Sequence, residues 1–197
     1  MKIAITGHTS GIGKCLYDTF TENGNTVLGF SRSNGYDITS ADDRKRIVDE
    51  TTDCDVFINN AFNFVDMASN CQLNLLEEVY EKHYNNEIIN KIVPQKNLDK
   101  ILIINMGSLI EDIPDSSFVK TEMLDYKKSK TVINEYCKNR KILNIKPGAV
   151  KSEEIKNRSP QLYAVANDPQ VVYQAVNVGI QLYKMPNQCF VYTIELG

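Results

Sequence analysis

The chain has 197 residues, of which 42% are hydrophobic and 24% charged, and its formal net charge is −3. This length and composition suit one globular domain. The weak acidic balance and dispersed basic residues exclude the concentrated positive charge expected of a nucleic-acid-binding or membrane-surface protein, and no apolar run reaches the length of a membrane span.

The predicted elements alternate between strand and helix. In chain order we expect a strand over residues 3–6, a helix over 11–23, a strand over 26–31, a helix over 41–50, a strand over 55–59, a helix over 73–93, a strand over 101–106, a helix over 119–138, a strand over 142–145, a helix over 168–183 and a strand over 189–196. This alternation predicts one α/β domain over 1–197, a Rossmann-type doubly wound parallel sheet flanked by helices.

Cysteine and histidine usage sets expectations about compartment and metals. Five cysteines are scattered without a CxxC pair, and the opening residues MKIAITGHTS enter a strand pattern at once. We therefore expect no signal peptide, and reduced thiols in a cytoplasmic protein. The two histidines, His8 and His83, lie outside any ligand-like spacing, so we expect no metal site.

A glycine-rich segment, TGHTSGIG at 6–13, joins the first expected strand to the first expected helix. Its glycines allow a tight turn and a close approach of the backbone to a phosphate. The helix that follows offers unpaired N–H groups and a positive dipole end to a pyrophosphate. The alternative is an ordinary loop that happens to hold three glycines. The place between strand and helix at the start of a βαβ pattern favours a dinucleotide site.

The glycine turn resembles the TGxxxGIG turn of the short-chain dehydrogenases/reductases. Four further stretches resemble motifs of that family, in its order. They are NNA at 59–61 (its NNAG segment), NMGS at 105–108 (the strand end with its catalytic serine), YKKSK at 126–130 (its YxxSK motif) and PGAV at 147–150 (its PG motif). Together the five stretches span nearly the whole chain.

Tyr126 and Lys130 lie four residues apart in a helical stretch and so share one face. A nearby ammonium lowers the pKa of a phenol from its ordinary ~10 and favours acid–base work. The resemblance implies that Tyr126 exchanges a proton with a substrate carbonyl oxygen, that Ser108 orients this oxygen, and that Lys130 also holds the nicotinamide ribose. The alternatives are a chance tyrosine–lysine spacing and a serine in an ordinary turn.

The family often adds an asparagine from the preceding long helix. The polar residues in the relevant stretch are His83, Asn85, Asn86 and Asn90. The apolar periodicity does not single one out; we favour Asn86, with an exposed polar face as the alternative.

The second expected strand ends in Ser31 and Arg32. NAD-binding sheets place an acidic residue there, whereas an arginine accommodates the 2′-phosphate of NADP, which it can meet with forked hydrogen bonds. We therefore predict NADP(H), with NAD(H) as the alternative if Arg32 only packs over the adenine. Asp37 and Ile38 resemble the family's Asp-Val-Thr segment beside the adenine, although Asp37 also suits a plain turn.

By this resemblance a set of residues is expected to hold the dinucleotide. They are Gly7, Thr9, Ser10, Gly11, Ile12, Gly13, Ser31, Arg32, Asp37, Ile38, Asn60, Ala61, Tyr126, Lys130, Pro147, Gly148 and Val150.

The chain departs from the family pattern in four places. Too few residues separate Arg32 from Asp37 for the helix usual there, and Phe62 replaces the glycine of NNAG. The segment 109–125 is longer than usual, and is either a substrate-facing loop or a solvated insertion. The segment 151–167, often a substrate lid, is short, so we expect an open pocket.

We therefore expect an oxidoreductase that interconverts a small-molecule carbonyl and alcohol by hydride transfer. The alternative is a non-catalytic dinucleotide sensor on the same fold. A nucleotide-sugar epimerase or dehydratase also uses this tyrosine–lysine spacing, but it usually needs a larger carboxy-terminal domain. By resemblance we also expect a homodimer or homotetramer built on the helices at 73–93 and 119–138.

Overall fold

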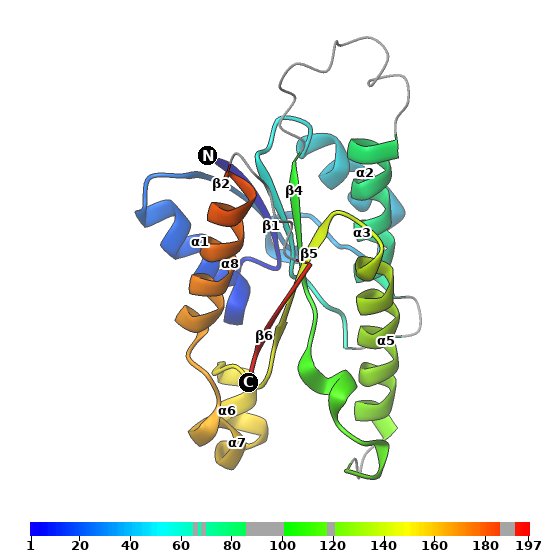
Figure 1. The fold of residues 1–197 in the computed structure, drawn as a ribbon, viewed down its shortest axis with the longest axis vertical. Coiled ribbons are helices and arrows are strands. Elements are labelled where there is room, and N and C mark those ends of the chain that lie inside the picture. Colours follow the sequence, from blue (N-terminus) through cyan, green and yellow to red (C-terminus); the bar gives the residue numbers. More distant parts are fainter. Residues whose placement is uncertain (65–66, 68–69, 86–100, 118–120, 186–191) are drawn as a thin grey trace.

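A computed structural model describes the chain except residues 65–66, 68–69, 86–100, 118–120 and 186–191 (Figure 1). Within the described residues, six parallel strands form one sheet in the order β2-β1-β3-β4-β5-β6. The strands are β1 (Lys2–Thr6), β2 (Thr26–Phe30), β3 (Val56–Asn59), β4 (Leu102–Met106), β5 (Ile142–Pro147) and β6 (Thr193–Leu196). The helices are α1 (Gly11–Glu22), α2 (Ala41–Glu50), α3 (Cys71–Tyr80), α5 (Thr121–Lys138), α6 (Glu153–Arg158), α7 (Pro160–Val165) and α8 (Pro169–Tyr183). Short 3-10 turns are η1 (Arg32–Asn34), η3 (Leu109–Asp112) and η4 (Asp115–Ser117), and η2 (Glu81–Asn85) is a π turn.

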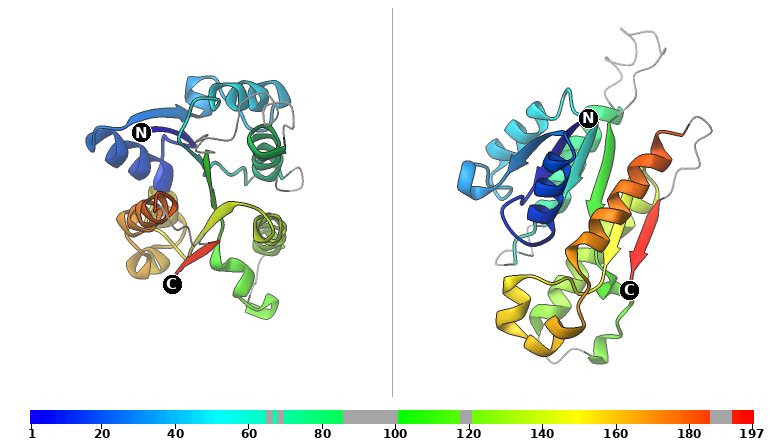
Figure 2. Two further views of the ribbon diagram at one scale, coloured as in Figure 1. Left: turned by 45° about the horizontal axis from the view of Figure 1, so that its top comes forward. Right: turned by 90° about the vertical axis from the view of Figure 1, so that its left-hand side faces the viewer.

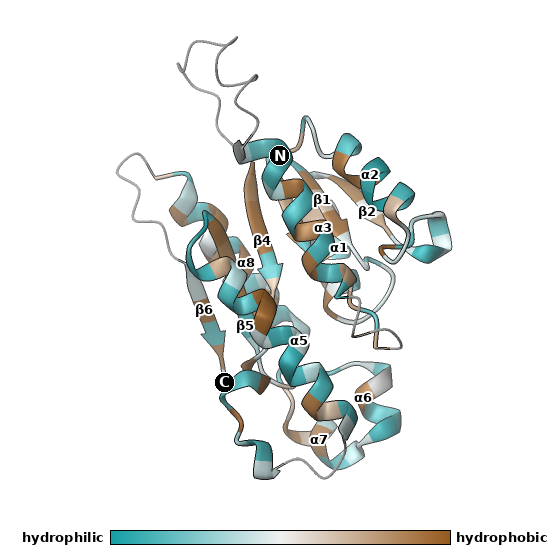
Figure 3. Cartoon of the chain, turned by 90° about the vertical axis from the view of Figure 1, so that its right-hand side faces the viewer, coloured by the Kyte–Doolittle hydropathy of each residue, from teal (hydrophilic) through white to brown (hydrophobic). Residues whose placement is uncertain are grey.

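The sheet is the middle of three layers (Figure 2). Helices α1 and α8 cover one face, α2, α3 and α5 cover the other, and α6 and α7 lie at the carboxyl ends of the strands (Figure 1). Because successive side chains of a strand point to opposite faces, Ile3 and Ile5 pack toward α1 and α8, whereas Ala4 packs toward α2 and α3. Strands β1 and β4 are largely hydrophobic, and the outer side of α5 is largely hydrophilic (Figure 3).

The strand order reverses beside β1. The chain adds β2 on one side of β1 and then crosses to add β3 on the other side. In open α/β sheets such a reversal leaves a crevice at the carboxyl ends of the strands, where ligands bind. The glycine turn after β1 and the segment after β3 both begin at this crevice.

The predicted fold class is confirmed, and several elements differ from their expected bounds. Of the helix expected over 73–93, α3 and η2 reach Asn85, and the rest lies outside the described residues. Of the strand expected over 189–196, the structure describes residues from Tyr192 onward, and within them β6 covers Thr193–Leu196. The segment 151–167 holds two short helices, because Ser152 caps α6 and Pro160 opens α7.

The sequence predicts that the helix usual in the family after the second strand is missing. In the described chain, the short turn η1 is the only helical element between β2 and α2. This leaves β2 at the edge of the sheet. The imidazole of His8 covers β2 at Gly29, where a Cβ would lie 2.4 Å from Cγ of His8. Tyr17 of α1 packs on the imidazole with ring centres 5.0 Å apart. His8 therefore fills part of the exposed flank. None of the described helices is long and apolar enough to cross a membrane.

Candidate active site

The glycine turn requires glycine at three positions. Gly7 and Gly11 have φ values of +71° and +53°, which L side chains rarely adopt. A Cβ on Gly13 would lie 2.1 Å from the carbonyl oxygen of Gly7. Ser10, the N-cap of α1, makes no side-chain capping hydrogen bond. The N–H groups of the first turn of α1 therefore remain available to an anion.

Hydrogen bonds join the end of β1 to the end of β3. Oγ1 of Thr6 accepts from the N–H groups of Asn60 and Ala61 at 2.9 Å each, and Nδ2 of Asn60 donates to the carbonyl oxygen of Thr6 at 2.9 Å. A Cβ on Gly7 would lie 3.1 Å from Cα of Ala61. The predicted residues Gly7, Asn60 and Ala61 thus meet at the crevice.

The predicted 2′-phosphate residues follow β2. Ser31 is the N-cap of η1, and Arg32 is exposed. Asp37 accepts from the N–H group and the hydroxyl of Thr39 at 3.0 and 2.9 Å. The N–H hydrogen bond, aided by the charge of Arg32, holds the pKa of Asp37 below its ordinary value. The side chain of Ile38 is buried in the core toward α2.

Of the other predicted turn residues, Thr9 is exposed and Ile12 packs against the core beneath α1. The PG motif lies at the carboxyl end of β5, which Pro147 closes. The N–H group of Gly148 donates to the carbonyl oxygen of Leu196 at 2.9 Å, and Val150 pairs with Asn167 in an isolated bridge. The motif is therefore fixed beside the crevice edge of the sheet.

Ser108, Tyr126 and Lys130 gather beyond the carboxyl end of β4. Ser108 follows β4 and is buried, and the other two are one turn apart on α5. Burial raises the pKa of Tyr126 above its ordinary value, and the neighbouring Ser108 hydroxyl acts in the opposite direction. Nζ of Lys130 lies 5.7 Å from the centre of the Tyr126 ring, and burial lowers the pKa of Lys130 to about 7.

The ring of Phe62, at the position of the NNAG glycine, covers the lysine. Its centre lies 4.5 Å from Nζ of Lys130 and 5.1 Å from the centre of the Tyr126 ring. Phe64 packs on the rings of Phe62 and Tyr126, at 4.9 and 5.2 Å. Since Lys130 is only 3% exposed, a ligand that contacts its ammonium has to displace the Phe62 ring.

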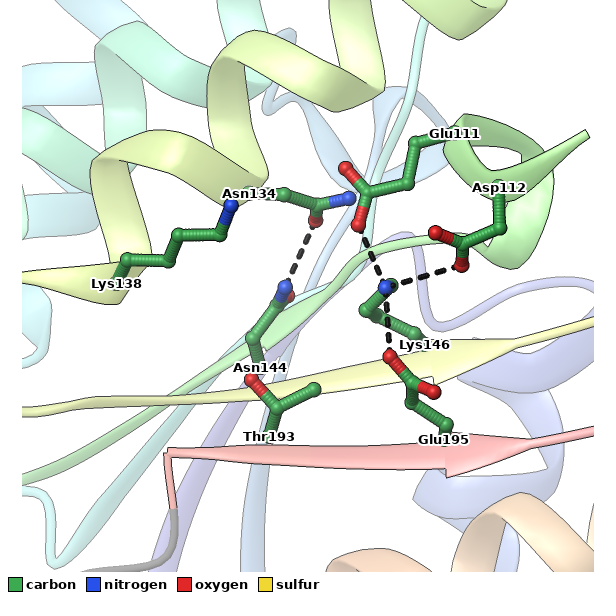
Figure 4. A pocket seen from close by; sticks show the side chains of 8 residues that line it. All are labelled: Glu111, Asp112, Asn134, Lys138, Asn144, Lys146, Thr193 and Glu195. Atoms are coloured by element: carbon green, nitrogen blue, oxygen red, sulfur yellow. Dashed lines mark hydrogen bonds and ion pairs between the residues drawn. The ribbon is translucent and has the colours of Figure 1, made fainter.

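A row of buried asparagines crosses the sheet next to Lys130. The strand register pairs Asn59 with Asn105 and Asn105 with Asn144. Nδ2 of Asn59 donates to Oδ1 of Asn105 at 3.1 Å, and Nδ2 of Asn105 donates to Oδ1 of Asn144 at 2.8 Å. Gln72 of α3 joins at one end, and Asn134 of α5 accepts from Asn144 at 2.7 Å at the other (Figure 4). We call these five residues the amide network.

A repeat in the sequence, distinct from the five family motifs, indicates the amide network. In three strands an apolar residue facing α3 and α5 is followed two places later by asparagine. The pairs are Phe57 and Asn59, Ile103 and Asn105, and Ile142 and Asn144. Because the side-chain period of a strand is two, each asparagine lies on the same face as its apolar partner. Buried amides need partners, so this repeat predicts a hydrogen-bonded row.

On the far side of the amide network, the buried side chain of Lys146 in β5 forms a cluster of ion pairs. Its side chain is 7% exposed, and Nζ pairs with Glu111, with Asp112 at 3.3 Å and with Glu195 at 2.7 Å (Figure 4). Burial acts to lower the pKa of Lys146, but its hydrogen bonds to the three carboxylates raise it above the ordinary value. A cavity of about 300 Å³ separates this cluster from Asn134.

The expectation of a solvated or substrate-facing insertion at 109–125 therefore needs correcting at its start. Glu111 is only 14% exposed in its side chain and pairs with Lys146. Further on, Asp115 pairs with Lys127 at 2.8 Å. Because η3 directly follows Ser108, these contacts hold the backbone after Ser108 against β5 and α5.

Of the candidates for a fourth catalytic residue, the structure describes the side chain of His83 alone. Nε2 of His83 lies 3.1 Å from Oγ1 of Thr51, at the end of α2. His83 is therefore excluded as the fourth catalytic residue. Asn86 and Asn90 lie outside the described residues, as does the side chain of Asn85, so Asn86 stays a prediction. Among the side chains that the structure describes, no group of His, Cys, Asp and Glu could hold a metal ion.

Comparisons with known proteins bear on the fold. No protein-family model matches the chain, and no curated protein sequence matches it. Among solved structures, 3-alpha-hydroxysteroid dehydrogenase from Pseudomonas sp. B-0831, complexed with NADH, is similar with a TM-score of 0.71 at 18% identity, over 100% of this chain and 94% of that chain.

Two further structures are similar in the same way. Serine dehydrogenase from Escherichia coli has a TM-score of 0.66 at 16% identity, over 100% of this chain and 97% of that chain. A short-chain dehydrogenase from Sphingobium yanoikuyae in complex with NADPH has a TM-score of 0.66 at 16% identity, over 98% of this chain and 87% of that chain. At these identities the likeness establishes a shared fold over nearly the whole chain.

Proposed function

We propose that this chain, which has the fold of the short-chain dehydrogenases/reductases, is an NADP(H)-dependent oxidoreductase that interconverts a carbonyl and an alcohol. The observation that carries the proposal is the gathering of Ser108, buried just after β4, with Tyr126 and, one turn further along α5, Lys130. These residues lie at the same edge of the sheet as the glycine turn, where such folds bind dinucleotides. A sensor would not need this acid–base pair.

The residues at the crevice fit a nicotinamide dinucleotide. The three turn glycines and the uncapped start of α1 suit its pyrophosphate. By resemblance, Asn60, Ala61 and the PG residues would line its nicotinamide half. When bound, this cofactor supplies or accepts the hydride.

Preference for NADP(H) is supported by the end of β2. Ser31 stands where a carboxylate would contact the ribose of NAD, and the neighbouring Arg32 is exposed. Asp37, the nearest acidic residue in sequence, has its carboxylate engaged by Thr39. An exposed guanidinium beside serine hydroxyls suits a phosphate group.

Three side chains would handle the proton. Ser108 orients the carbonyl oxygen of the substrate, and Tyr126 donates its proton to this oxygen during reduction and recovers it during oxidation. Charged Lys130 stabilises the phenolate left behind. General acid catalysis of this kind contributes about 10²- to 10⁴-fold to a rate.

The surroundings of Tyr126 indicate the substrate class. Phe64 packs on its ring and is 47% exposed. A carbonyl compound with an apolar substituent would cover the Phe64 ring when its oxygen reaches Tyr126, and burial of that apolar surface favours binding. We therefore infer a small apolar ketone or aldehyde.

We also infer a homo-oligomer built on α3 and α5, and a cytoplasmic location, since Cys15, Cys54 and Cys137 are thiols. Oligomerisation rests on resemblance. Sedimentation at micromolar concentration should give a dimer or tetramer, and a monomer would refute this part of the proposal.

The proposal is tested by following NADPH oxidation with a panel of apolar ketones and aldehydes. Tyr126→Phe should lower kcat at least ~10²-fold while leaving the Kd for NADPH within about twofold. Tyr173→Phe, a tyrosine of α8 on the other face of the sheet, is the matched control. Full activity of Tyr126→Phe would refute the catalytic assignment, and NADPH binding without any turnover would favour the sensor.

A further inference from the structure

Gln72 is the side chain that meets the ammonium of Lys130. Nζ of Lys130 donates to Oε1 of Gln72 at 2.7 Å and to the carbonyl oxygen of Met106 at 3.0 Å. Gln72 is 0% exposed and lies in the first turn of α3. Asn70, the N-cap of α3, accepts at Oδ1 from the hydroxyl of Ser129 at 3.3 Å. The start of α3 is thus tied to α5 one residue from Lys130.

The other partners of Gln72 determine which way its amide points. Nε2 donates to the carbonyl oxygens of Asn59 and Met106 at 3.1 and 3.2 Å, and to Oδ1 of Asn105 at 3.3 Å. A flipped amide would place its NH₂ group against the ammonium and its oxygen against two carbonyl oxygens, which only accept. Oε1 must therefore face Lys130.

Neutral acceptors are what stabilise the charge of Lys130. Burial lowers its pKa to about 7, and the opposing effect comes from Cys137. Burial raises the pKa of Cys137 to about 12, so near neutral pH this group is an uncharged thiol. Among the residues that the structure describes, the ring centres of Tyr126 and Phe62 also lie near Nζ, at 5.7 and 4.5 Å. Of the two oxygens that accept from Nζ, only that of Gln72 belongs to a side chain, so it is the one that substitution can remove.

We propose that Gln72 is a positioning residue: its amide oxygen keeps the Lys130 ammonium charged and directed beside Tyr126. The inference deepens the proposed function and rests on it for the role of Lys130 in the reaction. A charged lysine favours the phenolate of Tyr126, whereas a neutral lysine does not. Gln72 would thus set the upper pH at which the acid–base pair works.

The test measures the titration of Lys130 directly, in protein without nucleotide or substrate. Lysine side chains are labelled with ¹³C and ¹⁵N, and Lys130→Arg assigns the Lys130 signal. Wild type is compared with Gln72→Met, which removes the acceptor, and with Gln72→Glu, which adds a negative charge. Gln170→Met on α8 is the matched control, and the Lys146 signal is an internal reference.

Gln72→Met should move the Lys130 titration down by ~1 pH unit or more, as expected for a lost hydrogen bond to a charged group. Gln72→Glu should move it up by ~1 to 3 pH units, as for an opposite charge within 4–6 Å. In active enzyme the alkaline limb of kcat/KM should move in the same directions. Gln72→Glu keeps an acceptor oxygen facing Lys130 but places its second oxygen against the carbonyl oxygens of Asn59 and Met106, so we expect it to fold with reduced stability. It carries the test if Gln72→Met fails to fold, and Gln72→Met carries it in the opposite case.

An unchanged Lys130 titration in folded Gln72→Glu would overturn the inference, whatever the activity. An unchanged alkaline limb in a variant whose Lys130 titration has moved would also overturn it. The expected titration shifts in a protein that reduces no carbonyl would instead contradict the proposed function, while the contact of Gln72 with the lysine charge would stand.

Discussion

At the residue scale, the site contains a buried ammonium, that of Lys130, whose burial lowers the stability of the fold. Lys130 is buried beneath Phe62, with neutral oxygens as its hydrogen-bond acceptors. Uncompensated burial of an ammonium costs free energy, so this lysine is not retained for stability. Such conflicts between local stability and residue choice are expected at functional sites.

Lys130→Met should therefore stabilise the fold near neutral pH. The pKa of Lys130 is about 7 when folded, against an ordinary 10.5. Between these values the unfolded chain binds a proton that the folded chain does not, so wild-type stability falls as pH drops from 10.5 to 7. The stability advantage of the variant should shrink by on the order of 3 kcal/mol between pH 7 and 10.

Urea unfolding at pH 7, 8.5 and 10 measures this difference, with the same substitution at the exposed Lys156 as control. An advantage of Lys130→Met that does not vary with pH would refute the buried-charge interpretation.

Phe62→Ala should bind NADPH more tightly than wild type. The Phe62 ring packs on Tyr126 and Lys130, and these contacts have to break before a nucleotide reaches the lysine. Aromatic contacts of this kind are worth about 0.5–1.5 kcal/mol, so we expect Kd to fall about 2- to 10-fold in a fluorescence titration. Weaker binding by Phe62→Ala, with Phe64→Ala unchanged, would mean that Phe62 supports the nucleotide instead of covering its site.

Site residues could be predicted from the sequence where they belong to a short motif. The glycine turn, Ser108 and the pair of Tyr126 and Lys130 each lie in a short motif with its own local spacing, and the structure gathers the three motifs at one edge of the sheet. Gln72 could not be found this way, because its contact with Lys130 spans 58 positions and depends on how α3 packs against α5.

At the element scale, the amide network connects β3, β4 and β5 to the two helices that cover them. Gly107 is fitted closely against it: a Cβ there would lie 2.7 Å from Oδ1 of Asn134 and of Asn144. The glycine that precedes Ser108 therefore allows the strand end and the amides to approach each other.

Gly107→Ala should lower both stability and catalysis. Overpacking of a buried site costs about 1–3 kcal/mol, and the displaced backbone would move Ser108 away from Tyr126. Gly179→Ala is the matched control, because its Cβ would lie 2.2 Å from Leu143 Cδ2, in the core toward α8. Both variants should lose stability in urea unfolding, but only Gly107→Ala should lose kcat beyond its loss of folded protein. Equal kcat in the two variants would contradict the role of this approach.

Element type followed from periodicity, whereas strand register did not. Alternating apolar runs and helical spacings predict the strands and most helices. The repeat of an apolar residue followed two places later by asparagine predicts that these asparagines share one face. Which of them pair, Asn59 with Asn105 and Asn105 with Asn144, depends on the register of strands about forty residues apart in sequence, and the repeat does not specify that register. The short α6 and α7 were missed because their apolar periodicity is weak and only their caps, Ser152 and Pro160, signal them.

At the scale of the whole molecule, the strand order explains why these pieces form one site. The reversal beside β1 opens a crevice between the glycine turn and the segment after β3. The catalytic candidates Ser108, Tyr126 and Lys130 lie along the same edge. A ligand extended across the strand ends can therefore contact both the glycine turn and these three residues. The edge position of β2 leaves Arg32 exposed at the end where a 2′-phosphate would lie.

The measurement that tests this account most directly is a fluorescence titration of the purified protein with NADPH and with NADH, on wild type and on Arg32→Ala. The account predicts saturable binding of both nucleotides, tighter for NADPH. Arg32→Ala should weaken NADPH binding by about 10- to 100-fold, as for a lost charged hydrogen bond, and leave NADH within about twofold. Absence of binding for both nucleotides would contradict the assignment of the glycine turn, and with it the oxidoreductase.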